Sequence, residues 1–283
     1  MLDISVIVPV RNAEDLVDDC LASIARAEPR EIIVVDGLST DRTLEIAGQY
    51  PVRVLSDEGR GLPAARALGA QAASSKLVAL IDADVVLPEG ALERLVEEFK
   101  EEGYAALQAG LESVSGPGYW GQALADHHRS GRSKEWFGVV ATVFERDVLL
   151  EHGFDQAFLS GEDIELRWRL QQSGARIGVS RRTKVIHRFG DGFDFAKAQW
   201  LADGHGLGRM IGKHRWRAGL LLALPLAAGV RGTVLSVVRR QPRWIPYYLC
   251  YTIFNYIGML GELGRSRGQK SNGGTSGLSE QST

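Results

Sequence analysis

The first hundred residues alternate between two hydrophobic patterns, and this alternation limits the possible folds more than any other feature. Short apolar runs rich in β-branched residues, which are typical of buried strands, are each followed by apolar residues at helical spacing. Such alternation favours an α/β fold with a right-handed, mostly parallel sheet flanked by helices. The predicted elements are strands at 4–10, 31–35, 52–55 and 77–81, and helices at 13–26, 42–49, 64–73 and 88–100.

Acidic residues follow two of the predicted strands. Asp36 comes directly after the second strand, and Asp82 and Asp84 follow the fourth. Ligands of open parallel sheets bind at the carboxyl ends of the strands, so we expect these carboxylates to meet in one crevice. Paired carboxylates suit Mg²⁺ or Mn²⁺ that bridges a protein and a diphosphate. The alternative is an Asp-rich turn that caps the next helix.

Two further positions could contribute to the same crevice. Glu162 and Asp163 follow Gly161 at the start of a predicted helix, where the helix dipole keeps a carboxylate in the ionised state that a general base needs. Helix capping alone is the other interpretation of this pair. His187 ends a short predicted strand at 183–186 and is either a structural histidine or a third metal ligand.

A glycine-containing loop raises a competing hypothesis. Residues 59–64 match the pattern G-x-G-x-x-A of dinucleotide-binding proteins. The loop follows the third strand rather than the first, and Arg60 and Pro63 intrude on a segment that must approach a pyrophosphate closely. The sequence therefore disfavours a dehydrogenase.

Seven segments, taken in order, resemble the motifs of the family 2 glycosyltransferases, which have the GT-A fold. The resemblance covers about residues 3–190, and it implies an inverting, metal-dependent glycosyltransferase. The matching segments are 5–12, 34–41, 65–66, 80–84, 153–155, 161–163 and 185–187. One departure is Ala67, where the family often has asparagine.

The resemblance also implies a role for each matching residue. Pro9, Arg11 and Asp36 would line the nucleotide pocket, and Arg66 and Asp82 would hold the base, ribose or diphosphate of the donor. Asp84 would bind Mn²⁺ or Mg²⁺ with help from Asp82 and His187. Asp163 would be the general base, with Glu162 as its catalytic neighbour.

The implied reaction is a single displacement with inversion at the anomeric carbon. The donor would be a UDP- or GDP-linked sugar, and the acceptor would be the hydroxyl of a glycan or of a lipid-linked molecule. We expect residues 113–137 to face the acceptor and to be mobile, and His127 and His128 to lie at the surface of a loop.

Two alternatives stay open: a synthase that loads a polyprenyl phosphate, and a catalytically silent sugar-nucleotide-binding or scaffold protein. Residues 241–244, Gln-Pro-Arg-Trp, are one residue short of the Gln-x-x-Arg-Trp signature of polymer-making relatives and lie outside the expected catalytic domain, so a non-processive enzyme is expected.

Charge is distributed unevenly along the chain. Residues 205–270 contain eleven Lys/Arg and a single acidic residue, whereas residues 1–204 are acidic overall. Two apolar stretches, 218–230 and 244–261, lie in the basic part. We therefore expect a catalytic domain at 1–205, a membrane-associating segment at 206–265, and a disordered tail rich in Ser, Gly and Gln at 266–283.

The apolar stretches predict attachment to a membrane. The first is too short to span a bilayer, and the second is borderline at 18 uncharged residues. Helices lying in the interface, with arginines toward anionic headgroups, fit both stretches best. A span by 244–261 remains an alternative, as does a soluble domain whose apolar helices pack on the catalytic domain or on a second subunit. No secretory signal is recognised, and two distant cysteines fit a reducing compartment, so the cytoplasmic face is expected. No nucleic-acid partner is expected.

Overall fold

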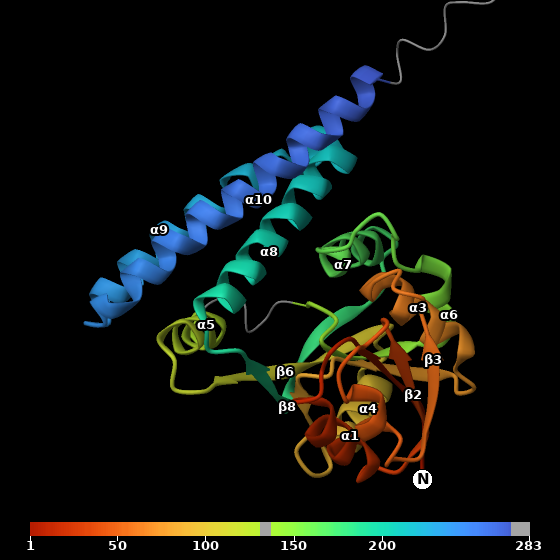
Figure 1. Ribbon diagram of the computed structural model, residues 1–283. Helices are drawn as coiled ribbons and strands as arrows, with labels where there is room; N and C mark the ends of the chain where they lie inside the picture. The colour runs from red at the N-terminus through yellow and green to blue at the C-terminus, as the bar shows by residue number, and fades with distance from the viewer. Residues whose placement is uncertain (131–136, 273–283) are drawn as a thin grey trace, which may run out of the picture. The chain divides into compact units, whose positions relative to one another are not determined.

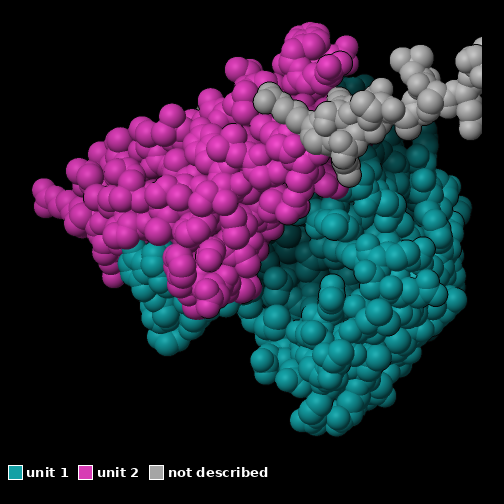
Figure 2. All heavy atoms as spheres, turned by 45° about the horizontal axis from the view of Figure 1, so that its top comes forward, with its two compact units in different colours: residues 1–191 teal, residues 192–283 magenta. Residues whose placement is uncertain are grey.

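The computed structural model describes residues 1–130 and 137–272. The chain divides into two compact units, residues 1–191 and 192–283 (Figure 2). The elements of the first unit are β1 (Leu2–Val10), α1 (Val17–Ala25), β2 (Pro29–Asp36), α2 (Thr43–Ala47), β3 (Val52–Ser56), α3 (Leu62–Ala72), β4 (Leu77–Ile81), β5 (Val85–Val86), α4 (Ala91–Glu102), β6 (Ala106–Ser115), α5 (Tyr119–Ser130), β7 (Ala141–Glu145), α6 (Arg146–His152), α7 (Glu162–Gln172) and β8 (Ile177–Phe189).

The first unit is built on one mixed sheet. Its strand order is β3-β2-β1-β4-β7-β6-β8-β5. The four strands that the sequence predicts are β1 to β4, and they pair in parallel as expected. The antiparallel strand β7 lies between β4 and β6, β8 pairs in parallel with β6, and the short β5 pairs antiparallel with β8. The predicted α/β class and the mostly parallel sheet are therefore confirmed.

Helices cover both faces of this sheet. One hydrophobic cluster joins the strands to α1 and α4, and a second joins them to α3, α6 and α7. Helix α3 lies especially close to β1, because a Cβ added at Gly69 would lie 2.3 Å from Cγ2 of Ile7. This close approach fixes the position of α3, which carries Arg66.

The second unit is helical. Its elements are α8 (Phe193–His214), the 3₁₀ helix η2 (Arg215–Ala223), α9 (Leu224–Val238), the 3₁₀ helix η3 (Pro242–Trp244) and α10 (Ile245–Asn272). Helices α8 and α9 each pack along α10 (Figure 1). The predicted C-terminal apolar and basic helical segment is thus confirmed. The predicted domain boundary near residue 205 lies inside α8, and α10 continues into the predicted tail, of which residues 273–283 lie outside the described part.

One stretch of helix in the described residues is long and apolar enough to cross a membrane. It runs over Phe193–Val238, and its most apolar 18-residue window has a mean hydropathy of 1.8. The stretch is not a single regular helix, because η2 interrupts it at Arg215, which has a φ of 53°. The second apolar stretch of the sequence, 244–261, lies almost wholly in α10, and the described part of α10 does not meet the same criterion.

Candidate active site

The first part of the candidate site lies where β1 and β2 end. Val10 pairs with Asp36 across the two strands, and the buried carboxylate of Asp36 accepts the backbone N–H of Ser39 at 3.1 and 3.2 Å. Pro9 is buried in β1, one residue before Val10. A Cβ added at Gly37 would lie 3.4 Å from Cβ of the exposed Arg11. The fold therefore brings Pro9, Arg11 and Asp36, the three predicted nucleotide-pocket residues, to one edge of the sheet.

Asp57 is a further strand-end acid that the sequence analysis missed. Its carboxylate accepts the backbone N–H groups of Gly59 at 2.8 Å and of Gly61 at 2.9 Å, and its side chain is almost fully buried. These backbone N–H groups thus already donate to a carboxylate of the chain, as expected for a loop that does not bind a pyrophosphate. The rule that identified Asp36 and Asp82 could have found Asp57, because it directly follows β3.

Arg66 connects two parts of the candidate site. Its Nη1 donates to Oε1 of Glu162 at 2.7 Å, and its Nη2 donates to Asp82 Oδ1 at 2.8 Å and Oδ2 at 3.0 Å. The guanidinium also lies 5.8 Å from the ring centroid of Phe154, and the side chain is only 2% exposed. Arg66 therefore orients two carboxylates, whereas the resemblance had assigned it to the donor itself.

Asp84 and His187 form a second pair beside Asp82. His187 Nε2 lies 3.2 Å from Asp84 Oδ2, and β5 brings the two residues together because its Val85 pairs with His187. The other carboxylate oxygen, Asp84 Oδ1, is buried and has no hydrogen-bond partner among the described residues. Asp84 therefore has one oxygen available for a ligand that is not part of the chain.

Electrostatics link these side chains. Burial raises the pKa of Asp82 to about 6, and the Asp84 carboxylate adds to this rise while Arg66 opposes it. Burial lowers the pKa of His187, but its hydrogen bond to Asp84 and the charges of Asp84 and Asp82 outweigh this effect, so the pKa is raised above its usual value. The site thus concentrates negative charge, which favours a cation.

The carboxylates of Asp82 and Asp84 and the imidazole of His187 are candidate ligands for a divalent cation. Within residues 1–130 and 137–272, no three or more His, Cys, Asp or Glu side chains are arranged to hold a metal ion. Both oxygens of Asp82 accept hydrogen bonds from Arg66, which leaves Asp84 and His187 as the side chains that can coordinate a metal ion. Mg²⁺ typically takes one or two protein carboxylates and completes its shell with water and phosphate oxygens. The arrangement fits a cation whose remaining ligands come from a bound diphosphate.

The first turn of α7 carries the other candidate carboxylates. Gly161 has a φ of 75°, a conformation that favours glycine, and it turns the chain into the helix. Glu162 is buried against Arg66, whereas the half-buried Asp163 interacts electrostatically with both Arg66 and Arg167. The two carboxylates therefore have different surroundings.

A buried ion pair fixes the position of α7. Glu165 is fully buried and accepts from Nε of Arg169 at 2.8 Å. The same guanidinium donates to the backbone carbonyl oxygens of His152 and Gly153 at the end of α6. Helix α7 is thereby held to α6, and this attachment positions Glu162 and Asp163 at its start.

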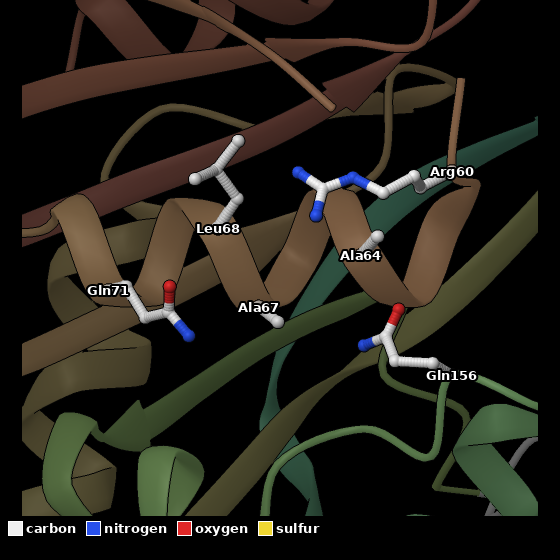
Figure 3. Close-up of a pocket in the computed structure, with 6 residues that line it drawn as sticks. All are labelled: Arg60, Ala64, Ala67, Leu68, Gln71 and Gln156. Carbon is white, nitrogen blue, oxygen red and sulfur yellow. The ribbon is translucent and has the colours of Figure 1, made fainter. Parts of the chain in front are cut away.

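A cavity of the first unit lies on the face of α3 opposite Arg66. It has a volume of about 420 Å³ and is lined by Arg60, Ala64, Ala67, Leu68, Gln71 and Gln156 (Figure 3). These α3 residues recur at helical spacing on the side away from Arg66. Ala67, which departs from the family pattern, therefore faces this cavity rather than the carboxylates bound by Arg66.

The segment predicted to face the acceptor is partly helical. Residues 119–130 form α5, and residues 131–136 lie outside the described part. The prediction of a surface loop at His127 and His128 is wrong, because both belong to α5. The His128 ring lies 4.9 Å from that of Phe189, which lies 4.6 Å from that of His187, and burial lowers the pKa of His128 well below its usual value.

Comparison with protein families and characterised sequences gives matches over most of the chain. The model for "Glycosyl transferase family 2" matches residues 5–144, and that for "Glycosyl transferase family group 2" matches residues 77–259. The succinoglycan biosynthesis protein ExoA of Rhizobium meliloti is 29% identical over 234 residues, which cover 73% of this chain and 69% of ExoA. The uncharacterized glycosyltransferase EpsJ of Bacillus subtilis is 32% identical over 105 residues, which cover 35% of this chain and 30% of EpsJ.

Solved structures share the fold. The mannosyltransferase PcManGT from Pyrobaculum calidifontis, in complex with GDP-Man and Mn²⁺, has a TM-score of 0.64 at 19% identity, and the match covers 91% of this chain and 87% of that one. Glucosyl-3-phosphoglycerate synthase from Mycobacterium tuberculosis, in complex with Mn²⁺, UDP and phosphoglyceric acid, has a TM-score of 0.56 at 21% identity, over 77% and 79% of the two chains. At these identities the similarity establishes the fold alone.

Proposed function

Because this chain belongs to glycosyl transferase family 2 and is a glycosyltransferase, we propose that it moves a single sugar, with inversion, from a UDP- or GDP-linked donor to an acceptor hydroxyl. The acceptor would be a glycan or a lipid-linked molecule. The observation that carries the proposal is that Arg66 forms ion pairs with two carboxylates at once, those of Asp82 and Glu162. Asp82 is close to the proposed metal ligand Asp84, and Glu162 is next to the proposed base Asp163.

The donor nucleotide would bind at the ends of β1 and β2. Pro9 and Arg11 would line the pocket, and the buried Asp36 carboxylate would accept hydrogen bonds from the base. The hydrogen bond from the N–H of Ser39 fixes the position of the Asp36 carboxylate, so this side chain needs little reorganisation when the nucleotide binds. The GDP-Man bound in PcManGT, which has the same fold, supports a nucleotide-sugar donor.

Asp84 and His187 would hold Mn²⁺ or Mg²⁺. The buried Oδ1 of Asp84, which has no hydrogen-bond partner among the described residues, supports this assignment, as do the two structures above that contain Mn²⁺. A bound cation would neutralise the charge that develops on the leaving nucleoside diphosphate. Asp82, oriented by Arg66, would face the donor beside it.

Asp163 would act as the general base. It would take the proton of the acceptor hydroxyl while that oxygen bonds to the anomeric carbon, and the bond from this carbon to the diphosphate oxygen would break. Attack from the face opposite the leaving group inverts the configuration. Because Glu162 accepts a hydrogen bond from Arg66, Asp163 is the better candidate for the general base.

A screen of donors and acceptors tests this function. UDP- and GDP-sugars are incubated with the protein and Mn²⁺, and the release of nucleoside diphosphate is measured with glycan, lipid-linked and polyprenyl-phosphate acceptors. We expect turnover with one donor and a hydroxyl acceptor. Turnover only with a polyprenyl phosphate would instead identify a synthase of that class. Nucleotide binding without turnover on any donor would identify a silent binding protein.

The second unit would attach the enzyme to the cytoplasmic face of a membrane. Support comes from the apolar helical stretch Phe193–Val238 and from the excess of Lys and Arg over residues 205–270. Such attachment would suit a lipid-linked acceptor. Cell fractionation tests it: we expect the protein in the membrane fraction at low salt, and its recovery in the soluble fraction would refute the attachment.

A further inference from the structure

The large apolar side chains of the second unit point mainly outward. Among the described residues, fourteen of the twenty-one large hydrophobic side chains that are exposed lie in this unit, which holds about a third of the chain. In the most apolar window of Phe193–Val238, only 22% of the residues are buried. The core helix of a soluble protein would bury most of such a window, so this apolar surface requires another explanation.

Eight of these fourteen exposed side chains form one stripe on α9 and one on α10. The members of each stripe follow one another at intervals of three or four residues, which places them on one side of their helix. Their exposed fractions lie between 52% and 71%. The stripe of α9 consists of Leu226, Val230, Val234 and Val238, and that of α10 of Leu249, Ile253, Ile257 and Leu260.

Glycines lie at close approaches between the helices, although large side chains such as Met210 and Met259 are also buried in this unit. A Cβ added at Gly232 of α9 would lie 2.0 Å from the ring of Tyr248 in α10, and one added at Gly229 would lie 1.9 Å from Oγ1 of Thr252. Between α8 and α10, a Cβ at Gly204 of α8 would lie 2.1 Å from the carbonyl oxygen of Asn255. At these three positions the helices approach one another through residues without side chains.

The interior also contains polar groups. Ser236 and Asn255 are buried in the bundle, and the buried Glu262 accepts from Nε of Arg209 at 2.8 Å. Water drives large aliphatic residues into the core of a soluble bundle. In lipid this driving force is missing, so helices pack through small and polar residues and expose aliphatic ones. The second unit has the arrangement that suits lipid.

We infer that the stripes on α9 and α10 insert into the acyl-chain region of an anionic lipid bilayer, so that apolar contact rather than charge provides most of the anchoring. The inference rests on the membrane attachment proposed above. It goes further than binding of the arginines to lipid headgroups, because it places the apolar side chains among the acyl chains. Arg231 flanks the α9 stripe, from which its long side chain can reach the headgroups.

Charge decides between lipid and a second copy as the occupant of these stripes. Exposed basic residues lie at both ends of the segment η2–α9: Arg215 and Arg217 in its first turn, and Arg239, Arg240 and Arg243 after its last residue. Two copies that met through these faces would bring like charges together, whereas anionic headgroups would neutralise them.

Site-directed fluorescence in vesicles tests the inference. The full chain with Cys250→Ser receives one new cysteine, Val234→Cys or Ile253→Cys, labelled with an environment-sensitive dye; Cys20 is buried and does not interfere. The matched control is Val54→Cys on β3, whose valine is 45% exposed in the first unit. Vesicles of phosphatidylcholine and phosphatidylglycerol should shift the emission at 234 and 253 to the blue, and lipids labelled in their acyl chains should quench it. At position 54 we expect neither effect.

Flotation of the vesicles separates the possible failures. We expect bound protein to stay with the vesicles in high salt, and the double variant Val230→Ser with Val234→Ser to be released, while Val54→Ser stays bound. Donor turnover of each variant serves as the folding control. Flotation without any dye shift, or full release of the unaltered chain by salt, would overturn the inference but leave the membrane attachment intact. No flotation at low salt would refute both. A blue shift without vesicles, together with a dimer mass, would show that a second copy covers the stripes.

Discussion

Nη1 of Arg66 donates to Oε1 of Glu162 at 2.7 Å, although the two residues are 96 positions apart in the sequence. Both side chains are buried, so water cannot compensate the charge of Glu162 if Arg66 is lost, and Arg66 would keep only Asp82 if Glu162 were lost. This ion pair connects α3 to the first turn of α7 and thereby fixes where Asp163 lies.

Replacing Glu162 should therefore affect stability more than the chemical step. We expect Glu162→Ala to lower the free energy of unfolding by about 3–5 kcal/mol, the usual cost of breaking a buried ion pair. Glu162→Gln retains a hydrogen-bond acceptor and should cost less. Chemical denaturation measures both variants. Equal stability of Glu162→Ala and the unaltered chain would show that the pair does not hold α7 in place.

Asp163 should matter for the chemical step only. We expect Asp163→Asn to lower kcat by about 10²-fold or more, the range of general-base catalysis, with the donor Kd unchanged. The neighbouring Glu162→Gln is the matched control. Near-normal turnover of Asp163→Asn would make Glu162 the next candidate for the base.

Asp84 should matter for metal-dependent donor binding. We expect the preferred donor to raise the Tm of the unaltered chain in the presence of Mn²⁺, because a ligand that binds the folded state stabilises it. Asp84→Asn should lose this rise, and removal of Mn²⁺ by a chelator should do the same to the unaltered chain. A full Tm rise in Asp84→Asn would exclude Asp84 as a metal ligand.

Asp57 should stabilise the loop before α3. In Asp57→Ala the N–H groups of Gly59 and Gly61 lose their charged acceptor, and a hydrogen bond to a charged group contributes about 1.5–3 kcal/mol. Asp57→Asn keeps one acceptor oxygen and should lose less. Thermal and chemical unfolding measure the difference. Unchanged stability of Asp57→Ala would mean that water replaces the carboxylate.

Much of the fold could be predicted because its first half is built from local patterns. The strands β1, β2 and β4 contain continuous apolar runs, at residues 6–10, 32–35 and 77–81. The extent of β8 could not be predicted, because its first half contains Arg181 and Arg182, and it is a strand through its pairing with β6. Pairing between distant segments leaves no periodic signal in either of them.

The same limit applies to the candidate site. The strand-end rule identified Asp36, Asp82 and Asp84, because a chemical group at the end of a parallel strand has only one edge to occupy. No rule of spacing could show that Arg66 binds two carboxylates. His128 was misplaced for a similar reason: a polar residue indicates a surface unless its contact with Phe189, 61 positions later, is known.

The enclosure of Arg66 also affects how this enzyme can diverge. A neutral residue at position 66 would leave the carboxylates of Asp82 and Glu162 uncompensated, whereas the loss of either carboxylate alone would leave Arg66 with one partner. Evolutionary change at position 66 should therefore be coupled to change at both carboxylates. Relatives that have lost the arginine should show compensating replacements at both carboxylates, and libraries that randomise one position at a time should return few active clones.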